Sequence, residues 1–360
     1  MFDIPILMLH TVNDEPQLSP MGQLSVSTAG LEQYLITFQK WNYQMISMTD
    51  LINHNYVDDR NFVVLTFDDG YKDNLTVALP ILKKYGARAT IFINPSYISK
   101  KSDKDSNWGF MTWDEVKEAE ESGVFDIQAH TMTHEFVFVS DEVVDYYTPE
   151  KFNKYYWLAW MLFPDSPQKW DSNVYIYKDL IPTGYPIFQY GRRIAQRKFI
   201  PDPEYVQYLI RAYQNNMHGI DNYVGVHGKY EDESAYKDYI KWEIIECKRV
   251  LEERLQKVID ILCFPGGGYT DMALDIAKKG GYKCYMVASR LREGNNFTHL
   301  ENVRKGQFNG FNRTAFSLIH PGLLPNAFFD KWVAKLSLGA YQKIPRYIIL
   351  KKLLSKVWHA

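Results

Sequence analysis

The chain has 360 residues and a mass of 42.2 kDa, with 46% hydrophobic residues, 23% charged residues and a formal net charge of −2. This composition excludes an intrinsically disordered chain, a collagen-like repeat and a small disulfide-stabilised domain. Because 41 Lys and Arg face 43 Asp and Glu, there is no overall basic field and we expect no nucleic-acid partner. No apolar run reaches the roughly 18 residues of a membrane-spanning helix.

Predicted strands and helices alternate along most of the chain. In order, we expect strands over 4–10 and 61–67, a helix over 74–85, a strand over 89–93, a helix over 112–122 and a strand over 124–129. The pattern resumes with a helix over 239–258, a strand over 259–264, a helix over 271–279 and a strand over 282–288. Such alternation predicts parallel βα units.

Between residues 141 and 238 this alternation breaks. The segment contains many prolines and is rich in Tyr and Trp, and its clearest helix pattern spans 204–215. Because linkers are poor in aromatic residues, we interpret the segment as an insertion subdomain. The α/β unit then comprises 1–140 and 239–330, and residues 331–360 form a separate tail.

The tail carries seven Lys and Arg and no Asp or Glu. From residue 347 onward its apolar and basic residues fall on different helical faces, which predicts a basic amphipathic helix that either docks on the domain or contacts a membrane surface through 344–358. The opening residues MFDIPILMLH lack a secretory leader pattern. We therefore expect a cytoplasmic protein, peripheral at the inner face of the membrane if the tail binds lipid.

Two adjacent carboxylates form the strongest chemical motif. Asp68 and Asp69 end an apolar strand in the run TFDDG, at the strand end where α/β barrels place their chemistry. Neighbouring residues on a turn diverge, so one carboxylate can bind a metal while the other faces a substrate. Because Asp-Gly is also ordinary turn chemistry, the motif alone leaves a purely structural turn open.

A pair of histidines follows the next predicted strand. His130 and His134, in the run HTMTH, leave the strand over 124–129. Two histidines four residues apart can converge on one ion with a carboxylate from elsewhere, which gives a His₂Asp site with an open position for water. The alternative is two unrelated surface histidines. The three cysteines, Cys247, Cys263 and Cys284, fit neither a zinc knuckle nor a redox pair, so we expect them to be reduced and buried.

These motifs resemble a known family. The runs FVVLTFDDGYKDNLTVALPILKKYGARATIFI, FDIQAHTMTH and ILCFPGGGYTDMALDIAKKGGY are similar to the polysaccharide deacetylases of carbohydrate esterase family 4, over roughly 4–138 and 239–290. The resemblance implies a partial, distorted (β/α)7 barrel. It also implies that Asp68 is the general base and that Asp69, His130 and His134 bind a divalent metal, usually zinc, with cobalt, nickel or manganese as alternatives.

The order of the motifs resembles a circularly permuted branch of that family, which includes poly-N-acetylglucosamine deacetylases. The Leu-x-His strand end, near the C-terminus in the common order, here lies at the start as Leu7-Met8-Leu9-His10. This resemblance assigns the general acid to His10, with His320 as the rival and a buried strand-end histidine as the structural alternative.

The third motif departs from the family pattern. Where the family has an arginine that holds the base, this chain reads Cys263-Phe264-Pro265-Gly266-Gly267. We therefore expect Arg304 to supply a cation near Asp68, the alternative being a surface salt bridge. Candidate substrate-binding residues are Tyr71, whose neighbourhood offers a backbone N–H to an oxyanion, and Pro265, Gly266 and Tyr269 around the sugar.

The resemblance implies a hydrolase that removes N-acetyl groups from amino sugars of a bacterial surface polysaccharide or its precursor, with an N-acetylated oligo- or polysaccharide as partner. Two alternatives stay open, a deformylase or amidase acting on a lipid-linked or small amide and a catalytically inactive glycan-binding homologue. In the insertion, the aromatic residues form either a glycan-binding lid or a small core, and three arginines face either solvent or an anionic sugar or phosphate. The aromatic residues are Tyr155, Tyr156, Trp157, Trp160 and Trp170, and the arginines are Arg192, Arg193 and Arg197.

Overall fold

The computed structural model describes residues 4–15, 24–53, 62–98, 109–163, 174–217, 222–288, 295–315, 345–346 and 349–350. The predicted tail helix, apart from four of its residues, the rival acid His320 and Trp170 lie outside the described residues. None of the helices in the described ranges has the length and apolar character needed to cross a bilayer.

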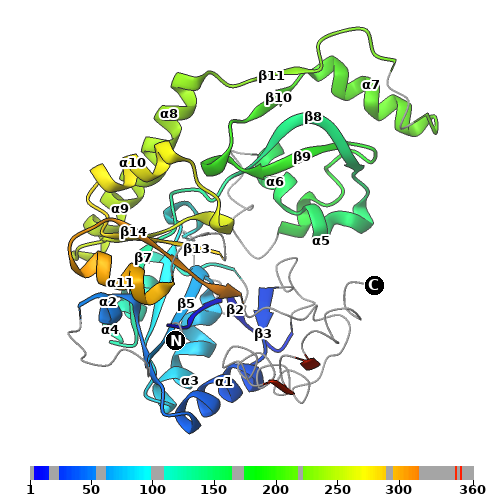
Figure 1. Cartoon of the computed structure of the whole chain (residues 1–360). Helices are drawn as coiled ribbons and strands as arrows, with labels where there is room; N and C mark the ends of the chain where they lie inside the picture. Colours follow the sequence, from blue (N-terminus) through cyan, green and yellow to red (C-terminus); the bar gives the residue numbers. More distant parts are fainter. Residues whose placement is uncertain are drawn as a thin grey trace.

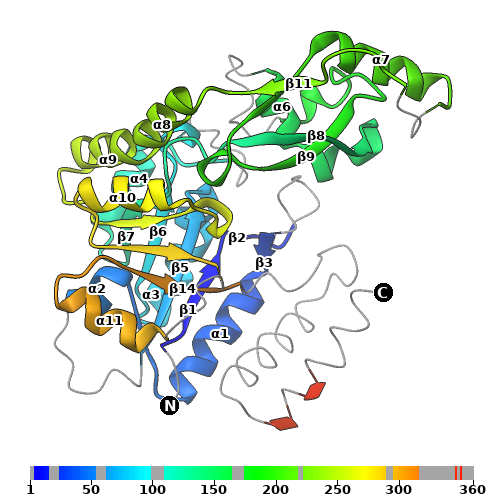
Figure 2. The same ribbon diagram turned by 45° about the horizontal axis from the view of Figure 1, so that its top comes forward.

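A nearly closed parallel sheet forms the centre of the molecule (Figures 1 and 2). Within the described ranges it has nine strands in the order β14-β13-β12-β7-β6-β5-β1-β15, with β4 also paired to β5. The strands are β1 (Ile6–Leu9), β4 (Gln44–Ile46), β5 (Phe62–Asp69), β6 (Ala89–Ile93), β7 (Phe125–Ala129), β12 (Ile261–Cys263), β13 (Cys284–Val287), β14 (Asn309–Asn312) and β15 (Thr314–Ala315). All the pairings are parallel, so the predicted α/β partial barrel is confirmed.

Helices surround this sheet. They are α1 (Thr28–Lys40), α2 (Met48–Asn53), α3 (Leu79–Lys84), α4 (Trp113–Glu121), α8 (Glu233–Lys241), α9 (Cys247–Leu255), α10 (Asp271–Lys279) and α11 (Asn296–Arg304), with π-helical segments η4 (Asn74–Ala78) before α3 and η10 (Trp242–Glu246) between α8 and α9. Helix α4 begins with the capping box that its sequence contains, since Thr112 and Glu115 bond reciprocally to each other's backbone N–H. The helix expected over 239–258 begins earlier, at Glu233, and is interrupted by η10.

Side-chain alternation divides the barrel strands into an inner and an outer layer. On β5, Val63, Leu65 and Phe67 pack in a cluster with residues of α1, α3, α4, α9 and α10. Phe62 and Val64 instead pack in a second cluster with residues of β1, β6, β12, β13 and β14. At the carboxyl ends of the strands and directly after them, the inner positions are occupied by polar side chains: His10, Asp68, His130, Cys263 and Arg313.

The insertion forms a second body next to this end of the barrel (Figure 1). Its described residues contain the antiparallel pairs β8–β9 and β10–β11 and the α-helices α5, α6 and α7. Their bounds are β8 (Phe136–Tyr146), α5 (Phe152–Tyr155), α6 (Trp157–Leu162), β9 (Pro186–Arg192), β10 (Phe199–Pro201), α7 (Pro203–Gln214) and β11 (Gly228–Tyr230). The boundary expected at residue 141 falls within β8.

Most of the aromatic residues of the insertion pack together. Tyr155, Tyr156 and Trp157 are buried in one cluster, and Trp160 packs against it. The same cluster includes Tyr71, Tyr97 and Phe110, which belong to the barrel side of the chain. Of the two roles left open for these aromatics, the structure therefore favours a core, and this core joins the insertion to the barrel.

Candidate functional site

Asp68 ends the buried strand β5 and is held by a guanidinium group. Arg313 Nη1 and Nη2 donate hydrogen bonds of 2.6 and 2.9 Å to Asp68 Oδ1 and Oδ2. Both residues are 2% exposed. Burial by itself would raise the pKa of Asp68, but the charge of Arg313 overcomes this effect and holds the pKa well below its ordinary value. Asp68 is therefore a carboxylate at neutral pH.

The prediction that Arg304 supplies this cation is wrong. Arg304 ends helix α11, and its Nη2 donates to the backbone carbonyl of Leu51 in α2 at 2.8 Å. The guanidinium beside Asp68 belongs instead to Arg313, which comes directly after β14. Arg313 is two residues after the inner residue Phe311, so it is the next side chain on the inner face of the barrel. The alternating run Asn309-Gly310-Phe311-Asn312-Arg313 was the sequence signal that could have identified it.

Asp69 brings a second carboxylate to two histidines. Its φ of 76° is rare for a residue other than glycine, and it takes the backbone out of the regular strand at this point. Asp69 Oδ1 lies 3.5 Å from His130 Nε2 and 3.6 Å from His134 Nε2. All three residues are buried, and their candidate ligand atoms lie within 4.8 Å of one another. The structure thus brings together the three residues predicted to bind a metal.

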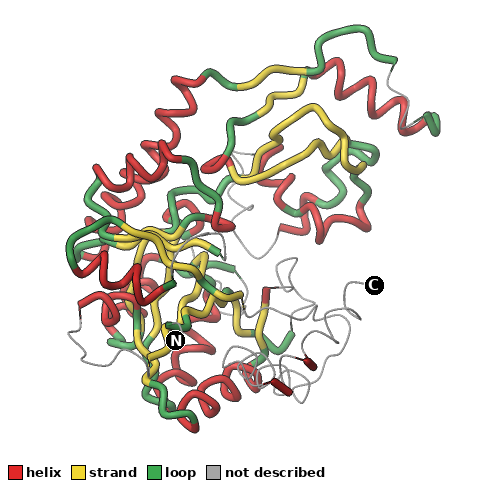
Figure 3. Tube along the Cα trace, in the orientation of Figure 1, coloured by secondary structure: helices red, strands yellow, loops and turns green. Residues whose placement is uncertain are grey.

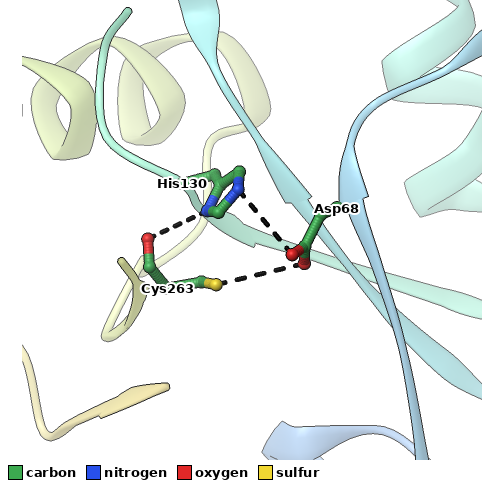
Figure 4. Close-up of side chains that lie close together, drawn as sticks. All are labelled: Asp68, His130 and Cys263. Carbon is green, nitrogen blue, oxygen red and sulfur yellow. Dashed lines mark hydrogen bonds and ion pairs between the residues drawn. The ribbon is translucent and has the colours of Figure 1, made fainter. Parts of the chain in front are cut away.

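The donor set fits a divalent cation. Ligand atoms about 2 Å from a tetrahedral ion are separated by about 3.3 Å, close to the separations between Asp69 Oδ1 and the two ring nitrogens. Among the described residues, none donates a hydrogen bond to Asp69 Oδ1, although this oxygen is buried. His130 Nδ1 lies 2.9 Å from the carbonyl oxygen of Cys263, to which it can only donate (Figure 4). This bond leaves the Nε2 lone pair available to a cation.

The electrostatics of the cluster also fit a cation. Burial lowers the pKa of His130 to about 4 and lowers the pKa of His134, so both imidazoles are neutral at pH 7. Burial and the neighbouring Asp68 charge raise the pKa of Asp69 to about 7. A buried carboxylate whose charge is disfavoured, next to two neutral imidazoles, is stabilised by a bound divalent cation.

Cys263 is a further neighbour of the base. Its Sγ lies 3.9 Å from Asp68 Oδ1, and burial keeps the thiol protonated by raising its pKa well above the usual value (Figure 4). All three cysteines are free and buried, as predicted. Cys263 lies at the strand end where the third motif of the family usually has an arginine. Because the Cys263 side chain is small and neutral, it leaves room for Arg313 next to Asp68.

A buried acid in a helix shapes the loop that carries the histidines. Glu243 lies in the π-helical segment η10, is 1% exposed, and accepts hydrogen bonds from Met132 N at 2.8 Å and Thr133 N at 3.0 Å, as well as from the Thr133 hydroxyl. The loop needs such support because Thr131 and His134 both have positive φ, at 62° and 52°. Glu243 therefore fixes the spacing between His130 and His134.

Replacing Glu243 by Ala is expected to weaken zinc binding by about 10- to 100-fold, the range typical of partners that orient metal ligands. The unsupported N–H groups of Met132 and Thr133 would no longer hold the loop. Zinc titration of the purified chain measures this change. Glu246→Ala is the matched control, because Glu246 is an acid of the same segment and, among the described residues, its side chain bonds to Arg249 and not to the histidine loop. Equal zinc affinity in the Glu243 and Glu246 variants would contradict the role assigned to Glu243.

His10, the expected general acid, lies beside the base. Its Nε2 is 3.9 Å from Asp68 Oδ2, and its backbone carbonyl accepts a 2.8 Å hydrogen bond from the side chain of Asn74. Burial lowers the pKa of His10, while the Asp68 carboxylate acts in the opposite direction and favours the protonated imidazole. The position fits a proton donor next to the base, and the catalytic role stays a prediction.

The four predicted substrate-binding residues have different surroundings. Tyr71 is buried and stacks on Phe110 with ring centroids 4.9 Å apart. Pro265 and Gly266 form the loop after β12, where Gly266 has a φ of 59°. Tyr269 packs on Phe264 and Tyr285, with centroids 5.5 and 5.6 Å away, in the outer layer. Contact of any of these residues with a substrate stays a prediction.

Several known proteins are similar to this chain in sequence. Residues 55–155 match the family model of polysaccharide deacetylases. The protein YxkH of Bacillus subtilis (strain 168), whose name places it among polysaccharide deacetylases, is 31% identical over 134 residues, which cover 36% of this chain and 43% of that protein. The poly-β-1,6-N-acetyl-D-glucosamine N-deacetylase of Escherichia coli (strain K12) is 20% identical over 289 residues, covering 77% of this chain and 33% of that protein. The chain thus spans less than half the length of these relatives.

Solved structures share the fold. A de-N-acetylase from Aggregatibacter actinomycetemcomitans superimposes with a TM-score of 0.52 at 18% identity, over 88% of this chain and 96% of the other. The BpsB deacetylase domain of Bordetella bronchiseptica gives 0.51 at 14% identity, over 87% and 96%. The fold is therefore shared with these structures, and the resemblance seen in the sequence is confirmed by the match of residues 55–155 to the polysaccharide deacetylase model.

Proposed function

We propose that this protein is a metal-dependent hydrolase that removes N-acetyl groups from amino sugars of a polysaccharide or its precursor. The observation that carries the proposal is the ionised Asp68, held by Arg313, next to the cluster of Asp69, His130 and His134. A carboxylate base beside a three-ligand cation site is the arrangement that hydrolysis by activated water requires. His10 beside Asp68 counts against the alternative of an inactive homologue.

Each side chain of the site has a separate role in the proposed reaction. A divalent cation held by Asp69, His130 and His134, with zinc the simplest choice for this donor set, would supply Lewis acidity that activates water and polarises an amide carbonyl. Asp68 accepts the proton of the attacking water, because Arg313 keeps its carboxylate ionised and oriented. His10 donates a proton to the nitrogen as the C–N bond breaks, so that the amine does not leave as an anion. Acetate and a free amino sugar result.

The relatives support the choice of substrate class. The Escherichia coli relative is named as a deacetylase of poly-β-1,6-N-acetyl-D-glucosamine, and residues 55–155 match a family of polysaccharide deacetylases. An N-acetylated glycan is therefore the substrate class to test first, before formyl or other small amides.

Acetate release from N-acetylglucosamine oligomers tests the proposal. The zinc-loaded chain is expected to release acetate, and Asp68→Asn is expected to lower the rate about 10²- to 10⁴-fold, the usual effect of losing a general base, with unchanged zinc content. Asp141→Asn is the matched control, because Asp141 is an exposed acid of β8 that pairs with His227. The proposal fails if the wild-type chain releases no acetate from any oligomer, or if Asp68→Asn keeps the full rate.

A further inference from the structure

One arginine of the insertion, Arg192, lies beside the loop that carries the predicted metal ligand His134. Strand β8 begins at Phe136, two residues after His134, and β9 lies antiparallel beside it as a second long strand of the insertion (Figure 3). In this pairing Arg192 is opposite Phe136. Arg192 is the last residue of β9, and the antiparallel pairing with β8 therefore brings it close to His134. In this way the insertion contributes a side chain to the barrel site.

Three parts of the site surround Arg192. Its Nη1 donates to the backbone carbonyl of His134 at 3.4 Å, and its Cζ lies 3.3 Å from the centroid of the Phe136 ring. A Cβ placed on Gly266 would lie 3.6 Å from Cγ and Nε of Arg192, so the loop after β12 passes close to the same side chain. The guanidinium therefore lies where the histidine loop, the hairpin and the loop after β12 meet.

Within the described ranges Arg192 forms no salt bridge, although the charge of Asp69 acts on it. Its guanidinium makes a single hydrogen bond there, to His134, and stacks on Phe136. The adjacent Arg193 differs, because it forms ion pairs with Glu135 at 3.0 Å and with Glu231. A guanidinium has five N–H donors, so most of the hydrogen-bonding capacity of Arg192 is left for another group.

The charge of Arg192 faces the reacting groups. It opposes protonation of His10 and His134 and favours the ionised carboxylate of Asp69. A guanidinium group keeps its positive charge at neutral pH.

We propose that Arg192 binds an anionic group, a carboxylate or a phosphate, on the N-acetylated sugar that occupies this site. The guanidinium matches the planar, two-oxygen geometry of either group. This inference rests on the proposed deacetylase function and narrows its substrate class to negatively charged glycans. Arg192 is then a specificity-determining residue, supplied by the insertion to a site whose chemical groups come from the barrel.

The test compares neutral and anionic sugars. For the zinc-loaded full chain, kcat/KM for acetate release is measured on an N-acetylglucosamine tetramer, on a hyaluronan tetrasaccharide that carries carboxylates, and on N-acetylglucosamine 6-phosphate beside free N-acetylglucosamine. Arg192→Gln is expected to lower kcat/KM about 10- to 100-fold on an anionic sugar, as for the loss of charge-assisted hydrogen bonds, and less than about threefold on its neutral counterpart. If only the sugars with carboxylates show the lower kcat/KM, Arg192 binds a carboxylate; if only the phosphorylated sugar shows it, Arg192 binds a phosphate.

Two further variants control this test. Arg197→Gln removes the same charge from the insertion, where Arg197 donates to the carbonyl of Glu231, and should leave the preference unchanged. Arg192→Lys, which keeps the charge without the planar fork, should lose less than Arg192→Gln. Equal losses on neutral and anionic sugars, or no loss on either, would overturn the inference while the deacetylase function stands.

Binding gives a readout that does not require turnover. Calorimetric titration of the same sugars into zinc-loaded Asp68→Asn, with and without Arg192→Gln, should show that the added substitution weakens anionic sugars alone. If the wild-type chain releases no acetate, the proposed function fails, and this titration still decides whether Arg192 binds anionic sugars. Tight binding of neutral sugars that Arg192→Gln weakens equally would contradict the inference.

Discussion

Arg313→Met should lower the rate of acetate release about 10²- to 10⁴-fold and destabilise the fold by about 3–5 kcal/mol. Without the guanidinium, burial dominates and raises the pKa of Asp68, so the base becomes protonated near neutral pH and loses its function. The stability cost follows because the substitution leaves a buried carboxylate without its partner. Acetate assays and chemical denaturation measure the two effects.

The pH dependence separates this mechanism from simple misfolding. In the wild type the pKa of Asp68 is depressed, so its stabilising effect is present above the unfolded-state pKa near 3.9 and is lost as the pH falls toward the folded-state value. In Arg313→Met the acidic limb of the rate profile should move to higher pH, and Arg313→Lys should restore it in part. Arg304→Met should keep the wild-type rate, because Arg304 bonds to Leu51 and not to the base. An unchanged acidic limb in Arg313→Met would contradict the argument.

Asp69→Asn should abolish both zinc retention and acetate release. The substitution removes the only carboxylate whose oxygen lies within 4 Å of both His130 and His134 in the described ranges, and we expect zinc affinity to fall by more than about 100-fold. The metal-free variant should be at least as stable as the metal-free wild type, because burial and Asp68 disfavour the ionised Asp69. Metal analysis after dialysis and thermal denaturation with and without zinc test both statements.

Asp73→Asn is the matched control for this substitution. Asp73 is also a buried acid, 1% exposed, and burial raises its pKa well above the ordinary value, as burial does for Asp69. It lies outside the three-ligand cluster, and its substitution should leave zinc retention unchanged. Zinc retention by Asp69→Asn, or equal loss in both variants, would contradict the assigned ligand set.

The ligand cluster could be predicted because it depends on short, local patterns. A buried strand followed by two aspartates, and a neighbouring strand followed by two histidines, place their side chains at one end of a parallel sheet whatever the details of the helices. The structure brings Asp69, His130 and His134 together as expected. The position of His10 followed from the resemblance to the permuted branch, and the pairing of β1 with β5 puts it beside Asp68.

The supporting residues were missed in the sequence, because their roles depend on long-range packing. The alternating run that ends in Arg313 identifies this residue only if the residues after β13 are known to continue the inner face of the barrel. Glu243 appeared as one acid among several on an amphipathic helix, and its contact with the histidine loop arises in the π-helical segment. The position of Arg192 depends on the β8–β9 hairpin of the insertion, for which the sequence analysis predicted no strands.

The pairing of Asp68 with Arg313 has a consequence for the order in which the site is assembled. The two residues are 245 positions apart, and Arg313 immediately precedes β15, which joins the sheet beside β1. A nascent chain still on the ribosome can fold β5 and expose its two aspartates long before the arginine has been synthesised. Until β15 docks, the base lacks its counter-ion, so competence for hydrolysis arises only when this strand joins the sheet beside β1.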